Sequence, residues 1–220
     1  KDLKRIRYTT SHPTDFTDDL VEVHKNCNKL MPIIHLPVQS GSNKILQEMN
    51  RKHNIEEYLK VIEKLKKAKP NIKFSSDFII GYPGEGYNDF EKTIELMNNV
   101  KFINSYSFTY SARPGTPAYN LTNINYEEAK KRLMNFKKIA EKIKTEYRNN
   151  LINKISTVLF ENNTKNEKEY FGRDEFFNSV IVKSENNLVG KIRSVKVLKI
   201  NQNTLFGEVI SYLNQKNYAA

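Results

Sequence analysis

The segment that most restricts the fold of this chain is a short apolar stretch, residues 74–80, followed at once by a turn. The stretch is rich in β-forming residues, long enough for a buried strand and too short for a helix. Gly81-Tyr82-Pro83-Gly84 follows, in which glycine permits positive φ angles and proline fixes its own. Residues 87–98 then have the periodicity of an amphipathic helix. The pattern predicts a strand, a loop and a helix, and in parallel β/α folds such loops hold ligands.

The same layout recurs elsewhere in residues 1–124. Further strands are expected at residues 6–10, 33–38 and 105–110. Helices are expected from about Thr17, as N-cap, to Lys25, and at residues 43–49 and 55–68. Strands that alternate with helices predict an α/β fold with a parallel sheet, whose strand-end loops share one face. Because a complete barrel has more strands, we expect a partial barrel and a further portion upstream of Lys1.

The pattern changes after residue 124. Residues 126–149 predict one long helix with an apolar stripe. Short strands with asparagine-rich turns between them are expected at residues 155–160, 170–173, 178–182, 191–200 and 204–210. They predict a small antiparallel β-barrel of the OB-like kind, which frequently binds nucleic acid. The predicted organisation is a partial β/α barrel (1–124), a connecting helix (125–150) and a β-barrel domain (151–212).

Composition excludes several classes of protein. Hydrophobic residues make up 38% and charged residues 28% of the chain, so a packed core is expected and general disorder is not. No apolar run approaches the roughly 20 residues of a membrane span, and the charged opening residues do not form a signal peptide. The single cysteine, Cys27, excludes an internal disulfide and any cluster or zinc site built from several cysteines of this chain. It fits a reducing, cytoplasmic location.

The net charge of +11 suggests a polyanionic partner. Residues 125–220 contain 18 Lys and Arg against 11 Asp and Glu, whereas residues 1–124 contain 18 against 14. A lysine- and asparagine-rich composition caused by codon bias would give the same charge. Both explanations stay open on charge alone.

Polar side chains gather where the predicted strands end, and parallel strands would bring them to one rim. Asp77 and Glu85 can accept hydroxyl or amino groups, and Arg113 can bind a carboxylate or phosphate through two hydrogen bonds. Each has a structural alternative, such as an Asx turn at Asp77, an ion pair at Arg113 or a core histidine at His12 and His35. No nucleophile–base pair, P-loop or HExxH motif supports hydrolysis or phosphoryl transfer. The strand-end residues are Thr10, Ser11, His12, Gln39, Ser40, Ser42, Asp77, Glu85, Ser111 and Arg113.

Four motifs resemble the radical-SAM methylthiotransferases. They are His35-Leu36-Pro37-Val38-Gln39-Ser40-Gly41-Ser42, Met49-Asn50-Arg51-Lys52-His53, Ser76-Asp77-Phe78-Ile79-Ile80-Gly81-Tyr82-Pro83-Gly84-Glu85, and Tyr106-Ser107-Phe108 with Ser111-Ala112-Arg113-Pro114-Gly115-Thr116-Pro117-Ala118. The opening Thr9-Thr10-Ser11-His12-Pro13 resembles the third barrel strand of the same family. The resemblance extends from about residue 1 to residue 210, in order and spacing. It implies the C-terminal half of a radical-SAM barrel and a TRAM domain, a small β-barrel thought to bind tRNA.

The resemblance also implies cofactors and a site. The family uses S-adenosylmethionine and two [4Fe-4S] clusters, one on a CxxxCxxC motif and one on three cysteines of an N-terminal domain. Cys27 matches none of these, so no metal-binding or catalytic residue is expected in this chain, which alone is expected to be inactive. By the resemblance, the S-adenosylmethionine pocket or its walls include Gln39, Ser40, Asp77, Ile79, Gly81 and Glu85. Ser111 and Arg113 would face the substrate or the sulfur-delivering cluster.

The implied activity is that of a transferase that adds a methylthio group to C2 of N6-isopentenyladenosine beside the anticodon of tRNA. Alternatives within the family are action on threonylcarbamoyl-adenosine or on an aspartate of a ribosomal protein. An alternative of another class is a non-catalytic RNA-binding module. The basic second half favours tRNA. An incomplete barrel has an open edge, so self-association through that edge is also expected.

Overall fold

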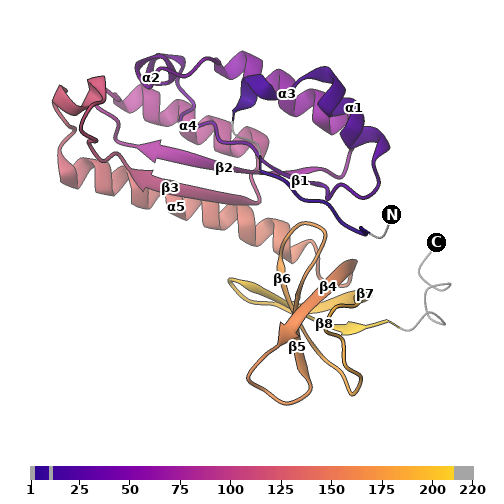
Figure 1. Cartoon of the computed structure of the whole chain (residues 1–220). Helices are drawn as coiled ribbons and strands as arrows, with labels where there is room; N and C mark the ends of the chain where they lie inside the picture. Colours follow the sequence, from indigo (N-terminus) through magenta and orange to yellow (C-terminus); the bar gives the residue numbers. More distant parts are fainter. Residues whose placement is uncertain (1–2, 10–11, 211–220) are drawn as a thin grey trace. The chain divides into compact units, whose positions relative to one another are not determined.

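The fold is described from a computed structural model, which places residues 3–9 and 12–210 (Figure 1). The chain forms two compact units, Lys1–Lys144 and Thr145–Ala220. The strand-end residues Thr10 and Ser11 lie outside the described residues. None of the helices in the described part of the chain is both long and apolar enough to cross a membrane.

The first unit contains a parallel sheet of three strands in the order β1-β2-β3. They are β1 (Ile33–His35), β2 (Lys73–Ile80) and β3 (Asn104–Thr109). The prediction of a strand at residues 6–10 is wrong for the part that the structure describes, residues 6–9. There, Ile6 forms only a single parallel bridge with Leu30. The strand expected at residues 33–38 stops early. The Ser76 hydroxyl donates to Leu36 O and accepts from Val38 N, so backbone pairing with β2 resumes only at Gln39.

The α-helices lie where the sequence predicts them, to within two residues at each end. In chain order the helices are η1 (Pro13–Asp15), α1 (Asp18–Asn26), α2 (Asn43–Glu48), α3 (Ile55–Ala68), α4 (Tyr87–Val100), η2 (Pro117–Asn120) and α5 (Tyr126–Asn149). The start of α3 is fixed by a capping box, in which Asn54 and Glu57 each accept a hydrogen bond from the other's backbone N–H. The short η1 and η2 helices were not predicted.

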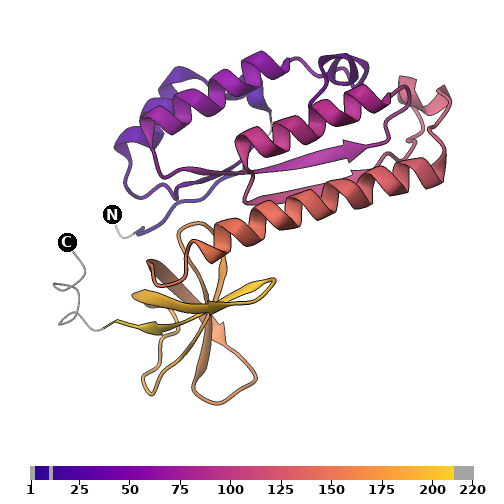
Figure 2. The ribbon, with the colours of Figure 1, turned by 180° about the vertical axis from the view of Figure 1, so that it is seen from behind.

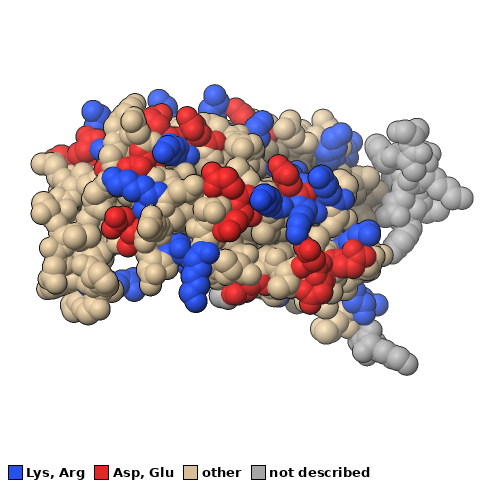
Figure 3. Space-filling model, turned by 90° about the horizontal axis from the view of Figure 1, so that it is seen from above, with Lys and Arg blue, Asp and Glu red and all other residues tan. Residues whose placement is uncertain are grey.

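One face of the sheet is buried under helices. Figures 1 and 2 show the two sides of this layer, with α3, α4 and α5 against the sheet. Phe74, Phe78 and Ile80 of β2 point into this core, where the Phe78 ring lies 4.8 Å from that of Phe136 in α5. On the outer surface seen from above, positive and negative side chains are interspersed (Figure 3). That surface therefore presents no patch of a single charge. The face of the sheet that is turned away from α3, α4 and α5 is open (Figure 1).

The second unit is a closed barrel of five strands in the order β4-β5-β6-β8-β7, with β7 paired back to β4. The strands are β4 (Ile155–Asn163), β5 (Glu169–Arg173), β6 (Ser179–Lys183), β7 (Ile192–Ile200) and β8 (Thr204–Val209). The expected barrel is confirmed, but it is not antiparallel throughout. β8 enters between β7 and β6, antiparallel to β7 and parallel to β6. Local sequence cannot show this, because it depends on which distant strand closes the barrel.

A buried histidine makes the first unit sensitive to acid. His24 of α1 is fully buried, and Tyr8 Oη lies 2.5 Å from its Nε2. Burial lowers the pKa of His24 to about 4, below its unfolded value of 6.5. The folded state therefore binds its proton less readily than the unfolded state. We expect the contribution of His24 to the stability of the first unit to be constant above about pH 6.5 and to fall as the pH drops towards 4.

Urea unfolding at several pH values measures this dependence, with His24→Phe as the variant that removes the titrating group. The free energy of unfolding should fall less steeply with decreasing pH in His24→Phe than in the wild type. The same slope in both proteins would show that another group dominates.

Candidate functional site

The loop that follows β2 is fixed by a glycine that cannot be replaced without strain. Gly81 has a φ of 75°, and a Cβ there would lie 2.8 Å from the Cβ of Ala129 in α5. Glu85 N donates to Tyr82 O at 2.9 Å and closes the turn. The buried Tyr82 donates its hydroxyl to Glu48 O of α2 at 2.8 Å. The loop is therefore tied to both α2 and α5.

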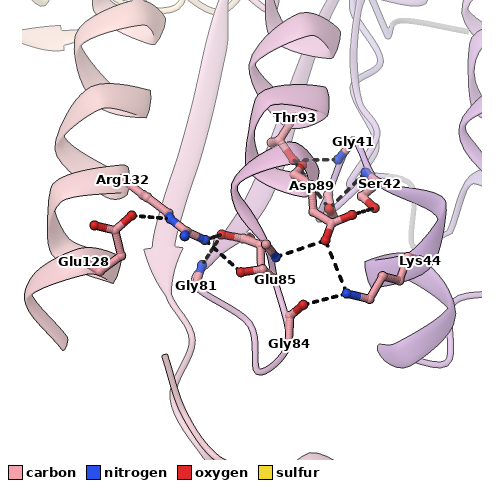
Figure 4. A network of polar contacts seen from close by, with 12 residues as sticks. Gly41, Ser42, Lys44, Gly81, Gly84, Glu85, Asp89, Thr93, Glu128 and Arg132 are labelled. Atoms are coloured by element: carbon pink, nitrogen blue, oxygen red, sulfur yellow. Dashed lines mark hydrogen bonds and ion pairs between the residues drawn. The ribbon is translucent and has the colours of Figure 1, made fainter. Parts of the chain in front are cut away.

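Glu85 points into the protein (Figure 4). Its side chain is 1% exposed, and its Oε1 accepts hydrogen bonds from Gly81 N at 3.2 Å and from Arg132 of α5 at 3.0 Å. Arg132 also donates to Glu85 O and to Glu128. Burial raises the pKa of Glu85, and the hydrogen bond from Arg132 opposes that rise. Oε2 has no hydrogen-bond partner in the part of the chain that the structure describes. This geometry makes Glu85 a residue that holds the loop in place.

A second polar network joins the loop to the segment before α2 (Figure 4). Ser42 donates its hydroxyl to Asp89 Oδ1 at 2.6 Å, and Gly86 N donates to Asp89 Oδ2 at 3.0 Å. Lys44 donates to Gly84 O at 2.8 Å and lies 3.4 Å from Asp89 Oδ2. Burial alone would raise the pKa of Asp89, but these hydrogen bonds and Lys44 hold it below its ordinary value. The two strand-end loops are thus held as one structure.

The buried end of the 39–42 segment packs on α4. Ser40 is 1% exposed, and its hydroxyl lies 3.4 Å from that of Thr93 and accepts from Ser42 N. Gly41 N donates to Thr93 Oγ1 at 2.9 Å. Gln39 has a φ of 76° and exchanges backbone hydrogen bonds with Asp77 O and Ile79 N. Gln39 therefore lies beside Asp77, whereas the Ser40 hydroxyl is directed into the protein.

The open face of the sheet presents a row of polar and aromatic side chains. The register between β2 and β3 places Asp77 beside Tyr106 and Ile79 beside Phe108. The rings of Tyr106 and Phe108 are both more than half exposed. His35 lies between Ser75 Oγ, 3.0 Å from its Nδ1, and Asp77 Oδ2, 3.3 Å from its Nε2. The Asp77 carboxyl group is about one-third exposed. This face can therefore offer a carboxylate acceptor next to flat apolar surfaces.

The remaining strand-end residues lie apart from these networks. Ser111 and Arg113 are exposed in the segment after β3, where Arg113 O accepts from Thr116. The His12 ring lies 5.0 Å from that of the buried His53. Within the described residues no group of three or more His, Cys, Asp or Glu could hold a metal ion. Sequence reasoning missed Asp89, Lys44 and Arg132; only Asp89, the acidic residue of the first turn of α4, which accepts from the N-cap Gly86 N, had a local signal.

Comparison with known proteins shows what the chain resembles. Residues 1–97 match the family described as the radical SAM superfamily. A tRNA-2-methylthio-N(6)-dimethylallyladenosine synthase of Pelagibacter ubique is 53% identical over 97% of this chain. Synthases of the same name from two Wolbachia strains are 47% and 46% identical over 93% of it.

One solved structure resembles the fold of this chain. The radical SAM enzyme coproporphyrinogen III oxidase of Escherichia coli matches 91% of this chain with a TM-score of 0.51, at 11% sequence identity and over 50% of its own length. That likeness concerns the fold alone. The chain spans about half the length of the curated relatives, 48% of the Pelagibacter protein and 47% of the two Wolbachia proteins.

Proposed function

We propose that this chain is the C-terminal portion of a radical SAM tRNA methylthiotransferase, which adds a methylthio group to C2 of N6-isopentenyladenosine beside the anticodon. One observation supports this most strongly: the chain is 53% identical, over 97% of its length, to a protein named for this modification. The alignment covers nearly the whole chain, so it includes the strand-end loops and the barrel alike. The whole protein would be a cytoplasmic transferase.

The residues of the open face fit the adenosyl part of S-adenosylmethionine. Asp77 offers an acceptor for hydroxyl groups, and Ile79, Tyr106 and Phe108 offer flat apolar surface for a purine. Gln39 and the Gly81 backbone border this face, while Ser40 and Glu85 support it from behind. When bound, S-adenosylmethionine supplies the methyl group and the adenosyl radical of this chemistry. Ser111 and Arg113 are proposed to face the substrate.

The iron–sulfur clusters of the family do not fit the residues of this chain. The sequence contains one cysteine, Cys27, at the end of α1, whereas each cluster needs several cysteine thiolates. The two clusters are therefore proposed to be bound by other parts of the protein.

The domain organisation follows the same proposal: residues 1–124 as part of a radical SAM barrel, residues 125–150 as a connecting helix, and residues 151–212 as a TRAM domain of the OB-like kind. The parallel three-stranded sheet and the closed five-stranded barrel support it. Self-association through the open edge also stays a prediction, supported by the position of β1 as an edge strand of the sheet. Sedimentation as a single monomer at high concentration would contradict it.

The basic second half should bind tRNA electrostatically. Lysine and arginine that neutralise several phosphates release counterions, so affinity depends steeply on salt. We expect the chain to bind tRNA weakly and to lose at least about tenfold in affinity between roughly 50 and 200 mM salt. Fluorescence anisotropy with labelled tRNA measures this. Binding that is independent of salt, or absent at low salt, would remove tRNA as the partner.

The activity is tested with the complete gene product after reconstitution of its clusters. Unmodified and isopentenyl-containing tRNA are incubated with it, and the nucleosides are identified by mass spectrometry. The proposal expects 2-methylthio-N6-isopentenyladenosine. A product on threonylcarbamoyl-adenosine or on a ribosomal-protein aspartate instead would assign a different substrate.

A further inference from the structure

The outward side chains of β5, β6 and β8 form one continuous surface on the barrel. Side chains alternate along a strand, and the inward set consists of Tyr170, Val180, Val182 and Leu205. Phe171, Ile181 and Phe206 therefore point outward. The strand register places Ile181 directly between Phe171 and Phe206. We call these three partly exposed residues the aromatic row.

The Arg173 side chain lies at the β5 end of the aromatic row. The Arg173 guanidinium lies 5.3 Å from the centre of the Phe171 ring and 4.3 Å from that of Phe177. It also donates to Phe177 O at 3.3 Å and to Ser179 Oγ at 3.4 Å. The two rings and two acceptors restrict the movement of the Arg173 guanidinium. This cation is therefore already ordered beside the aromatic row.

A lysine borders the other end. The Lys199 ammonium lies 5.2 Å from the centre of the Phe206 ring, and Lys199 is paired in register with Phe206. The acidic groups on this surface are Glu169, which accepts hydrogen bonds from Thr164 and Asn166, and the exposed Glu208. Lys183 lies opposite Glu169 and Lys196 opposite Glu208, so each of these two carboxylates faces a lysine. Arg173 and Lys199 are then an excess of positive charge on this surface.

Flat rings with cations at both ends match the chemistry of a nucleic acid strand. Bases stack on aromatic side chains whatever their sequence, and adjacent cations contact the phosphates. We propose that the aromatic row is the surface on which the barrel binds RNA, with unpaired bases stacked on Phe171 and Phe206 and phosphates at Arg173 and Lys199. This rests on the proposed function, which requires an RNA substrate.

Binding to two labelled RNAs tests the stacking. One is a short stem-loop with unpaired loop bases, and the other is a fully paired duplex of similar length. Phe171→Leu and Phe206→Leu keep apolar packing but remove the flat ring. Each should bind the stem-loop about tenfold more weakly, while duplex binding changes less than about twofold. Tyr126→Leu is the matched control, because Tyr126 of α5 is an exposed ring with a lysine beside it and lies outside the barrel strands.

The phosphate contact is tested by salt dependence. Lys199→Gln should make the slope of log affinity against log salt shallower by about one, the change expected for one phosphate, whereas the leucine variants should keep the wild-type slope. Lys154→Gln, at an exposed position just before β4, is the control and should change the slope less.

The outcomes separate two failures. Stem-loop binding that is as strong in Phe171→Leu and Phe206→Leu as in Tyr126→Leu overturns the proposed role of the aromatic row and leaves the proposed function standing. Failure of the wild-type chain to bind either RNA overturns both the aromatic row as an RNA-binding surface and the proposed function. Thermal unfolding of each variant shows that a loss of binding is not a loss of fold.

Discussion

Arg132→Met should lower the free energy of unfolding of the first unit by about 3–5 kcal/mol, because it leaves the Glu85 carboxylate buried without its cation. The Glu85 side chain is 1% exposed and that of Arg132 is 11% exposed, so water cannot replace the lost partner. Burial already raises the pKa of Glu85, and without Arg132 that pKa should rise further. Urea unfolding followed by helical circular dichroism measures the loss.

Two controls identify the cause. Arg132→Met combined with Glu85→Gln should recover part of the lost stability, because the neutral amide needs no cation. Lys64→Met removes the ion pair with Asp18, in which both side chains are more than half exposed, and should change stability by less than about 1 kcal/mol. Equal losses in Arg132→Met and Lys64→Met would show that the buried pair has no special importance.

Gly41→Ala is expected to have a similarly large effect, about 3 kcal/mol, for a steric reason. A Cβ at Gly41 would lie 2.4 Å from Lys92 O and 2.6 Å from Thr93 Cα, both backbone atoms of α4 that cannot move singly. The 39–42 segment would have to separate from α4 and lose the hydrogen bond from Gly41 N to Thr93. The same urea unfolding experiment measures the loss.

Gly86→Ala is the matched glycine control in the same network. Its φ is −78°, and the nearest atom to an added Cβ is the flexible Asp89 carboxylate oxygen at 3.5 Å. It should cost less than about 1 kcal/mol. A loss at Gly41 no larger than that at Gly86 would mean that the segment and α4 separate easily.

Sequence predicted the elements well where local signals are strong. The bounds of α3 and α5 are as expected, because both have a continuous apolar stripe and α3 also has cap residues. The early end of β1 has no local signal, because it depends on the Ser76 hydroxyl of β2, which bonds to Leu36 O and Val38 N. The left-handed backbone of Gln39 has none either, since glutamine does not favour a positive φ.

The site was predicted less well because it depends on contacts between distant residues. That Glu85 helps form the S-adenosylmethionine pocket or its walls stays a prediction, but the sequence did not indicate its bond with Arg132, 47 residues away on α5. Neither residue has a local pattern that indicates this pairing. The parallel contact of β6 with β8 is similar, because it depends on how the barrel closes. Asp77 and Ile79 share the open face as expected, since alternation along a strand is a local property.

The most direct test of the proposed function is a chimera. This chain replaces the matching half of the Pelagibacter ubique tRNA-2-methylthio-N(6)-dimethylallyladenosine synthase, and the chimera is expressed in bacteria that lack the modification. A second chimera with the matching half of the Wolbachia wMel protein, 46% identical to this chain, controls for the junction. We expect the tRNA to contain 2-methylthio-N6-isopentenyladenosine. A soluble chimera that yields no such nucleoside, while the Wolbachia chimera does, would contradict the assignment.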